Sequence, residues 1–174
     1  MQKASSEIIE FTLYYNKYKR KLFNFVNKVI RNKMFTEDII QDIFLKFFKN
    51  LNTIRNKDSI PCWLFKLARN EVSMYLRNKN VRVDQFNTSD PYEVQVVSQM
   101  NLADTFELDE IKNLIMQELD TMTIEQKEPF LLKEYGGLSY KEISQVMEID
   151  EELVKSRLYK TRQKLLKIIS SVIK

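Results

Sequence analysis

Residues 135–162 read YGGLSYKEISQVMEIDEELVKSRLYKTR, and this stretch decides the fold of the C-terminal part of the chain. Two adjacent glycines are placed to end one helix, and Ser139 with Glu142 three residues later forms the capping-box pattern that begins another. Asp150, followed by two glutamates, offers the N-cap of a third and longer helix. A helix, a glycine turn, a short helix, a tight turn and a long basic helix follow the order of a helix-turn-helix motif.

The last predicted helix carries an apolar stripe on one side and basic residues around it. Val154, Leu158 and Leu165 fall on one face at helical spacing, and from Leu153 onward the chain has 7 Lys/Arg and no acid. A helix that reads duplex DNA needs this arrangement, because apolar residues anchor it while donors enter the major groove and basic flanks meet phosphates. A solvated amphipathic helix is the alternative, but the preceding helix-turn pattern favours DNA. The candidate contacts are Lys155, Ser156, Arg157, Tyr159, Lys160 and Arg162.

Three further helices are predicted in the N-terminal half, each with apolar residues at helical spacing. The first covers about residues 8–30, and the second begins at Thr36, interpreted as its N-cap, and ends near Leu51. Pro61 fits the first turn of the third helix, which reaches about Lys79. The residues predicted to face the core are Phe11, Tyr15, Tyr18, Leu22, Phe25, Val29, Ile39, Ile40, Ile43, Phe44, Phe47, Phe48, Leu64, Leu67, Ala68, Val72 and Leu76.

Two of these helices also carry polar faces that need an explanation. On the third, a stripe at spacings of three and four residues could stack on and read unpaired bases, although Trp63 alone would fit a core position equally well. With the adjacent Arg69, its members are Trp63, Lys66, Asn70, Ser73 and Arg77. The second helix presents Asp38, Gln41 and Asp42 outward. Acids do not suit DNA, so that face is predicted to be solvated or to meet a basic protein partner.

Charge is distributed unevenly along the chain. Residues 1–80 hold 16 Lys/Arg against 7 Asp/Glu, whereas residues 81–110 hold 1 against 7 and lack a sustained apolar period. The acidic segment is therefore predicted to be a linker that joins two basic regions of the chain. This pattern is typical of a protein that binds a polyanion at two places.

Several classes of site are excluded by composition. The chain has no histidine, which rules out imidazole catalysis and histidine metal sites. Its one cysteine, Cys62, cannot form an internal disulfide and is predicted to be a small buried apolar residue, as fits a reducing cytoplasm. No apolar run approaches the length of a membrane span, so no membrane insertion is expected.

Four motifs in this chain resemble those of a known family. TEDIIQDIF at residues 36–44 and CWLFKLARN at residues 62–70 are similar to conserved region two of the extracytoplasmic-function (ECF) sigma factors. YGGLSYKEI at residues 135–143 and VKSRLYKTR at residues 154–162 are similar to their region four. In this order, the motifs extend the resemblance over nearly the whole chain.

The resemblance implies an all-α protein of two small helical domains, region two at residues 1–80 and the region-four helix-turn-helix at residues 111–174, joined by a flexible acidic linker at 81–110. It implies a transcription initiation factor that binds the clamp and flap of bacterial RNA polymerase core and directs it to promoters. Promoter DNA and an anti-sigma factor are the other expected partners. Neither enzymatic activity nor a cofactor is expected, because the polymerase performs the chemistry.

The resemblance also implies a role for each candidate residue. Asp38, Gln41 and Asp42 match the helix that binds the polymerase clamp. Asn70 matches the residue near the pocket for a flipped minus-ten base, with Trp63 and Arg69 beside it. The other members of the stripe, Lys66, Ser73 and Arg77, are predicted to contact the same element. Lys155, Ser156, Tyr159 and Lys160 match the recognition-helix residues at the minus-thirty-five element, and Arg157 matches a phosphate contact. Arg162, on a flank of the same helix, is predicted to contact this element as well.

Two other classes of function remain as alternatives at this stage. One is a dimeric helix-turn-helix regulator that binds duplex DNA without polymerase, which would leave the acidic outward face unexplained. The other is a metal-dependent enzyme acting on nucleic acid, with Glu37, Asp38 and Asp42 as ligands, but the sequence shows no further acid that converges with them.

The division into two domains predicts the pattern of limited proteolysis. Because residues 81–110 are acidic and aperiodic, a protease should cut there first and release fragments that end near residue 80 and begin near residue 110. Mass spectrometry of the early fragments measures this. First cleavage within residues 124–170 would contradict the proposed boundary.

Overall fold

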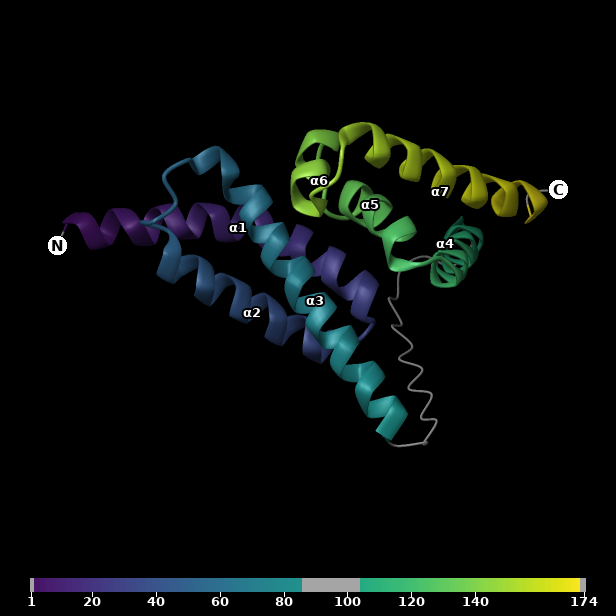
Figure 1. Cartoon of the computed structure of the whole chain (residues 1–174), viewed down its shortest axis with the longest axis horizontal. Coiled ribbons are helices and arrows are strands. Elements are labelled where there is room, and N and C mark those ends of the chain that lie inside the picture. The colour runs from purple at the N-terminus through teal and green to yellow at the C-terminus, as the bar shows by residue number, and fades with distance from the viewer. Residues whose placement is uncertain (1, 86–103, 173–174) are drawn as a thin grey trace.

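The computed structural model describes residues 2–85 and 104–172, and all of the regular structure in these ranges is helical. The predicted all-α fold is confirmed. Of the predicted linker 81–110, residues 86–103 lie outside the described residues. The elements shown in Figure 1 are α1 (Gln2–Ile30), α2 (Lys33–Asn50), the short 3-10 helix η1 (Lys57–Ser59), α3 (Ile60–Gln85), α4 (Asp104–Thr121), α5 (Ile124–Glu134), α6 (Tyr140–Met147) and α7 (Glu151–Val172).

Helices α1, α2 and α3 form the N-terminal unit (residues 2–85), whose core is rich in aromatic rings. The Phe44 ring contacts Tyr15 of α1 at 4.7 Å between centroids, and Phe47 contacts Phe11 at 6.0 Å. Most residues predicted to face the core are buried or partly buried, but Phe48 is 41% exposed and that prediction was wrong. The predicted core residues that are buried are Tyr18, Leu22, Phe25, Ile40, Ile43, Phe44, Phe47, Leu64, Ala68 and Val72.

The start of α2 differs from the prediction. Asn32, which has extended backbone, is the N-cap, and its side chain accepts a hydrogen bond from the Phe35 backbone N–H at 3.1 Å. Thr36 lies inside the helix, fully buried, and its hydroxyl donates to the Asn32 carbonyl oxygen at 2.8 Å. The cap therefore falls four residues earlier, and the two acids after Thr36 lie beyond the first turn. The start of α3 agrees with the prediction, since Pro61 is its second residue.

Helices α4 to α7 form the C-terminal unit (residues 104–172), which contains the predicted helix-turn-helix. The capping box of α6 is confirmed: the Glu142 backbone N–H donates to Ser139 Oγ, and the Ser139 backbone N–H donates to Glu142 Oε2. On α7, Val154, Leu158 and Leu165 are buried as predicted. Thr161 is buried with them, and its hydroxyl donates a hydrogen bond to the carbonyl oxygen of Gln126, in the first turn of α5, at 3.0 Å.

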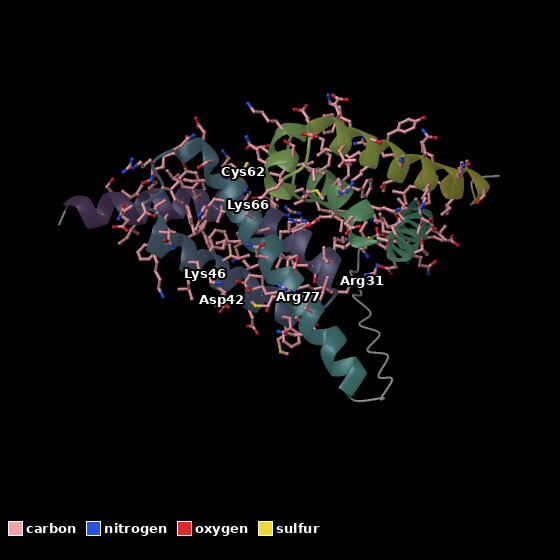
Figure 2. All side chains as sticks on the ribbon, in the orientation of Figure 1. Arg31, Asp42, Lys46, Cys62, Lys66 and Arg77 are labelled. Carbon is pink, nitrogen blue, oxygen red and sulfur yellow. The ribbon has the colours of Figure 1, made fainter. Side chains whose placement is uncertain are left out.

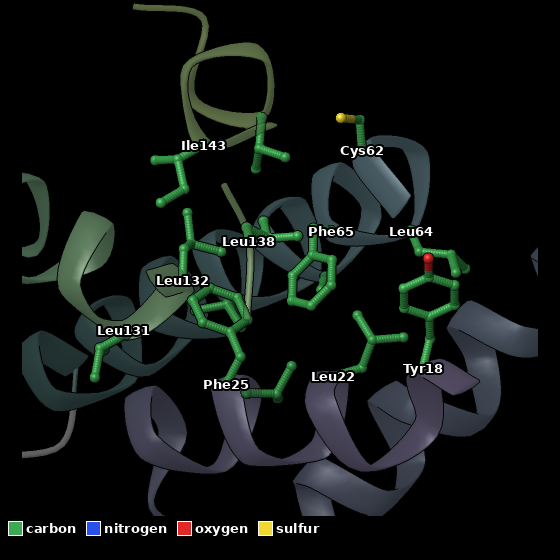
Figure 3. Packing of buried hydrophobic residues seen from close by; sticks show 14 of the residues in the cluster. Tyr18, Leu22, Phe25, Cys62, Leu64, Phe65, Leu131, Leu132, Leu138 and Ile143 are labelled. Atoms are coloured by element: carbon green, nitrogen blue, oxygen red, sulfur yellow. The ribbon is translucent and has the colours of Figure 1, made fainter. Parts of the chain in front are cut away.

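The two units share one continuous apolar core, as the side chains in Figure 3 show. Phe65 of α3 is fully buried between Phe25 of α1, whose ring centroid is 6.0 Å away, and the turn after α5. At that turn, a Cβ atom on Gly136 would lie 2.9 Å from Phe65 Cε1 and 2.5 Å from the Leu132 carbonyl oxygen. Gly136 is therefore required by close packing. Its neighbour Gly137 has a left-handed φ of 69° and faces more open space.

This contact predicts that Gly136→Ala destabilises the chain. The added methyl group must displace both the Phe65 ring and a backbone carbonyl, so the free energy of unfolding should fall by about 1–3 kcal/mol. Urea denaturation followed by circular dichroism measures the change. Gly137→Asn is the matched control, because asparagine tolerates the left-handed region, and it should cost less. Equal loss for both variants would contradict the packing argument.

Candidate functional site

The polar stripe of α3 lies on the surface of the N-terminal unit. Asn70, Ser73 and Arg77 are exposed, and Arg77 Nε lies 3.4 Å from the Ser73 carbonyl oxygen. Trp63 is only partly buried, with its ring centroid 5.9 Å from that of Phe47. One side of the indole therefore packs on the aromatic core while the rest remains accessible. The structure thus keeps part of the predicted stripe open to a ligand.

The two remaining cations of that surface are paired with acids of the C-terminal unit. Lys66 Nζ lies 2.9 Å from Glu148 Oε1, and Arg69 Nε donates to Glu128 Oε1 at 2.8 Å. The pairs join residues 82 and 59 positions apart, so sequence reasoning missed both acids. Figure 2 labels Lys66 on α3, the helix against which α6 packs.

Glu128 is an unusual acid because it is only 5% exposed. Burial raises the pKa of its carboxyl above the ordinary glutamate value, and the charges of Arg69 and Arg157 act in the opposite direction. Burying a carboxylate costs free energy unless a cation pairs with it, and Arg69 is the cation that stabilises the charged form of Glu128. The signal available in the sequence was weak, because a glutamate inside an amphipathic helix is ordinarily assigned to the solvated face.

The predicted DNA-contacting residues of α7 divide into two groups. Three of them are engaged within the C-terminal unit: Lys155 pairs with Glu152 at 2.8 Å, Arg157 Nη1 donates to the Glu125 carbonyl oxygen at 3.3 Å, and Arg162 Nη2 lies 2.9 Å from Glu134 Oε1. The pKa values of Lys155 and Arg162 are raised, chiefly by these hydrogen bonds. The other three are exposed on the outer face: Ser156, Tyr159 and Lys160. Tyr159 is 66% exposed.

The acidic face of α2 is accessible in the structure. Asp38, Gln41 and Asp42 are all exposed, and Leu45 on the following turn is 59% exposed. An exposed leucine three residues after an acid gives this face a mixed acidic and apolar character, which suits a protein partner better than a nucleic acid. Leu45 was not predicted. The signal in the sequence was an apolar residue at a helix position that faces solvent together with Asp38, Gln41 and Asp42.

Within residues 2–85 and 104–172, no group of three or more His, Cys, Asp or Glu side chains could hold a metal ion. Glu37, Asp38 and Asp42 therefore do not converge with other described acids. In the same ranges, no helix combines the length and apolar character needed to cross a membrane. Cys62 is buried as predicted, and burial raises the pKa of its thiol.

Comparison with known proteins gives two family matches and several relatives. The family model "Sigma-70 region 2" matches residues 14–82, and "Sigma-70, region 4" matches residues 112–165. Relatives include the ECF RNA polymerase sigma-E factor of Haemophilus influenzae, 23% identical over 88% of this chain and 84% of that protein. The ECF RNA polymerase sigma factor SigX of Bacillus subtilis is 26% identical over 84% of this chain and 76% of that protein.

Two solved structures have the same fold. One is the sigma factor RpoE in complex with the anti-sigma factor NepR from Bartonella quintana, with a TM-score of 0.75, 19% identity and coverage of 92% of this chain and 97% of that chain. The other is CnrH in complex with the cytosolic domain of CnrY, with a TM-score of 0.68, 18% identity and coverage of 98% and 94%. The two family matches together span more than half of the sequence, in the order that its motifs predicted. This chain belongs to the ECF group of the bacterial RNA polymerase sigma factors.

Proposed function

We propose that the chain binds RNA polymerase core through the exposed α2 face and directs it to promoters by contacts from α3 and α7. This proposal rests on one observation: the exposed face of α2 differs in chemical character from the exposed faces of α3 and α7. Asp38, Gln41, Asp42 and Leu45 form an acidic and apolar face, whereas the exposed parts of α3 and α7 present amides, hydroxyls and cations. A dimeric duplex-binding regulator has no use for the α2 face.

In this function, the two DNA-reading surfaces perform different tasks. The exposed Asn70, on the same helix as the partly accessible Trp63, suits an unstacked base, whose capture offsets the few kcal/mol needed to extrude it from a duplex. Tyr159 and Lys160 on α7 suit the edges and phosphates of an intact major groove. The polymerase carries out the chemistry, and the chain acts in the cytoplasm by positioning and melting the promoter.

An anti-sigma factor is also proposed as a partner. The similar RpoE was crystallised with the anti-sigma factor NepR, and this chain shares its fold over most of its length. An anti-sigma factor for this chain would compete with polymerase for the α2 face or hold the two units in a fixed arrangement.

The α2 face can be tested by charge reversal. Asp42→Lys combined with Leu45→Ala should weaken binding to core polymerase at least tenfold, because it removes an acid and an apolar contact from one exposed patch. Fluorescence anisotropy of labelled protein titrated with core measures the affinity. Glu110→Lys, on the exposed surface of α4, is the charge-matched control and should bind normally. Loss of helicity in the double variant would instead assign these side chains a structural role.

The division of labour between α3 and α7 can be tested with two alanine variants. Lys160→Ala should weaken binding to duplex that contains the upstream promoter element, by about 1–3 kcal/mol and only on the cognate sequence if Lys160 reads a guanine edge. If it contacts phosphate alone, the loss should be uniform across sequences and the salt slope should fall by about one. Asn70→Ala should leave duplex binding unchanged and reduce open-complex formation.

The readouts are electrophoretic mobility shifts on duplex and permanganate footprinting of the melted strand, both with core polymerase present. A pre-melted template should rescue Asn70→Ala only in part if Asn70 also reads the base. Equal losses on closed duplex for the two variants would refute the division and favour a simple dimeric regulator.

A further inference from the structure

The face of α7 that points away from the C-terminal unit is organised around one row of side chains. α7 packs on α4, α5 and α6 through its buried face, which includes Val154, Leu158 and Leu165 (Figure 1). The helical repeat places a second set of positions opposite that face, at spacings of four, three and four residues. These exposed residues form the outer row: Glu152, Ser156, Tyr159 and Gln163.

Cations border the outer row on both sides. They are Lys155 and Arg162 on one flank and Arg157, Lys160 and Lys164 on the other. A helix that enters the major groove places its central row against the base edges and its basic flanks against the phosphates. The row that reaches furthest toward the bases therefore begins with a carboxylate, Glu152, between two cationic flanks.

The carboxylate of Glu152 is both accessible and oriented. Its side chain is 84% exposed, and its Oε1 accepts a hydrogen bond from Lys155 Nζ at 2.8 Å. The same Lys155 Nζ lies 3.7 Å from Glu151 Oε1, so one cation offsets part of the charge of both acids. Because a carboxylate can accept hydrogen bonds on both oxygens, the contact with Lys155 leaves Glu152 able to accept another bond through Oε2.

The chemistry of the base edges selects one partner for this carboxylate. An ionised carboxylate accepts hydrogen bonds and donates none. In the major groove, cytosine presents an amino donor without an acceptor, adenine combines its amino group with the N7 acceptor, and guanine and thymine present acceptors only. We infer that Glu152 determines the sequence specificity of α7 by accepting a hydrogen bond from cytosine N4 in the upstream promoter element. This inference rests on the proposed function, because it assumes that α7 enters the major groove.

Rejection of other bases contributes to this specificity as much as attraction to cytosine. Opposite guanine or thymine, the carboxylate of Glu152 faces acceptor atoms and loses hydration without gaining a partner. Its charge also repels phosphates on every sequence, so Glu152 lowers the general affinity of α7 for DNA while it raises selectivity. An acid that only stabilised the start of α7 through the helix dipole would leave base preference unchanged.

Glu152→Gln tests the inference, because glutamine keeps the length of the side chain but recognises adenine through N6 and N7. Duplexes with a randomised segment are selected by the full chain, alone and in complex with core polymerase, and the retained sequences are determined. The wild type should favour cytosine over guanine and thymine about tenfold at one position of the element. Glu152→Gln should lose that preference and favour adenine at the same position, with the other positions unchanged.

Glu151→Gln is the matched control. It removes the same charge from the neighbouring residue and from the same lysine, but position 151 lies outside the outer row, on the flank that carries Lys155. This variant should bind all duplexes more tightly, as the loss of an acid predicts, and should keep the cytosine preference. Both side chains are exposed, so circular dichroism should show wild-type helicity for both variants.

Three results would overturn the inference: a wild type without a cytosine preference, a Glu152→Gln variant that keeps it, or the same change of preference in the two variants. Loss of the preference without a gain of adenine supports the contact, because it still assigns the discrimination to the carboxylate. The proposed function is tested separately, by transcription with core polymerase from templates that carry the selected element. Absence of transcription with the expected base preferences intact would reject the function and leave the reading of cytosine in place.

Discussion

The arrangement of the molecule depends on one close contact, between the ring of Phe65 and the backbone at Gly136. Because position 136 has no Cβ, α3 can approach the turn after α5 closely enough for the two units to share a single core. Apolar burial supplies the favourable free energy of this contact, since Phe65, Leu132 and Leu138 are almost entirely removed from water. The ion pairs around it contribute less, because the desolvation of charges offsets much of their attraction. Their role is to determine which faces meet.

Local patterns predicted the helices because the cause of each helix lies within a few residues. Apolar spacing placed α1, α2 and α3, and the Ser139–Glu142 capping box placed the start of α6. The start of α2 shows that two nearby residues can both fit the N-cap pattern. Asn32 is the N-cap, and the hydroxyl of Thr36 donates a hydrogen bond to the carbonyl oxygen of Asn32. The boundary of α2 could not be predicted from residue types alone, because both residues are good caps.

The site was predictable only where its residues face solvent. The prediction that four polar residues are exposed is confirmed, because their positions opposite the apolar face of each helix determine their exposure. These residues are Asp38, Gln41, Asp42 and Asn70. The partners of Lys66 and Arg69 could not be foreseen, because they come from the other unit and no local period encodes them. The partners of Arg157 and Arg162 were not foreseen either, although they lie in the same unit: the two arginines brace α7 against α5 through Glu125 and Glu134. A cation on a predicted helix face can therefore be part of the support of that helix as well as part of its ligand surface.

The ion pairs between the units also have a quantitative consequence for assembly on DNA. If closed and open arrangements interconvert, the apparent dissociation constant for DNA equals the intrinsic value divided by the open fraction, so a chain that is open one part in ten binds about tenfold more weakly. A polymerase that binds only the open arrangement removes that factor by mass action. Binding of core polymerase and binding of DNA then become coupled through this chain, and the ion pairs that Arg31 and Glu148 make between the units contribute to the coupling free energy.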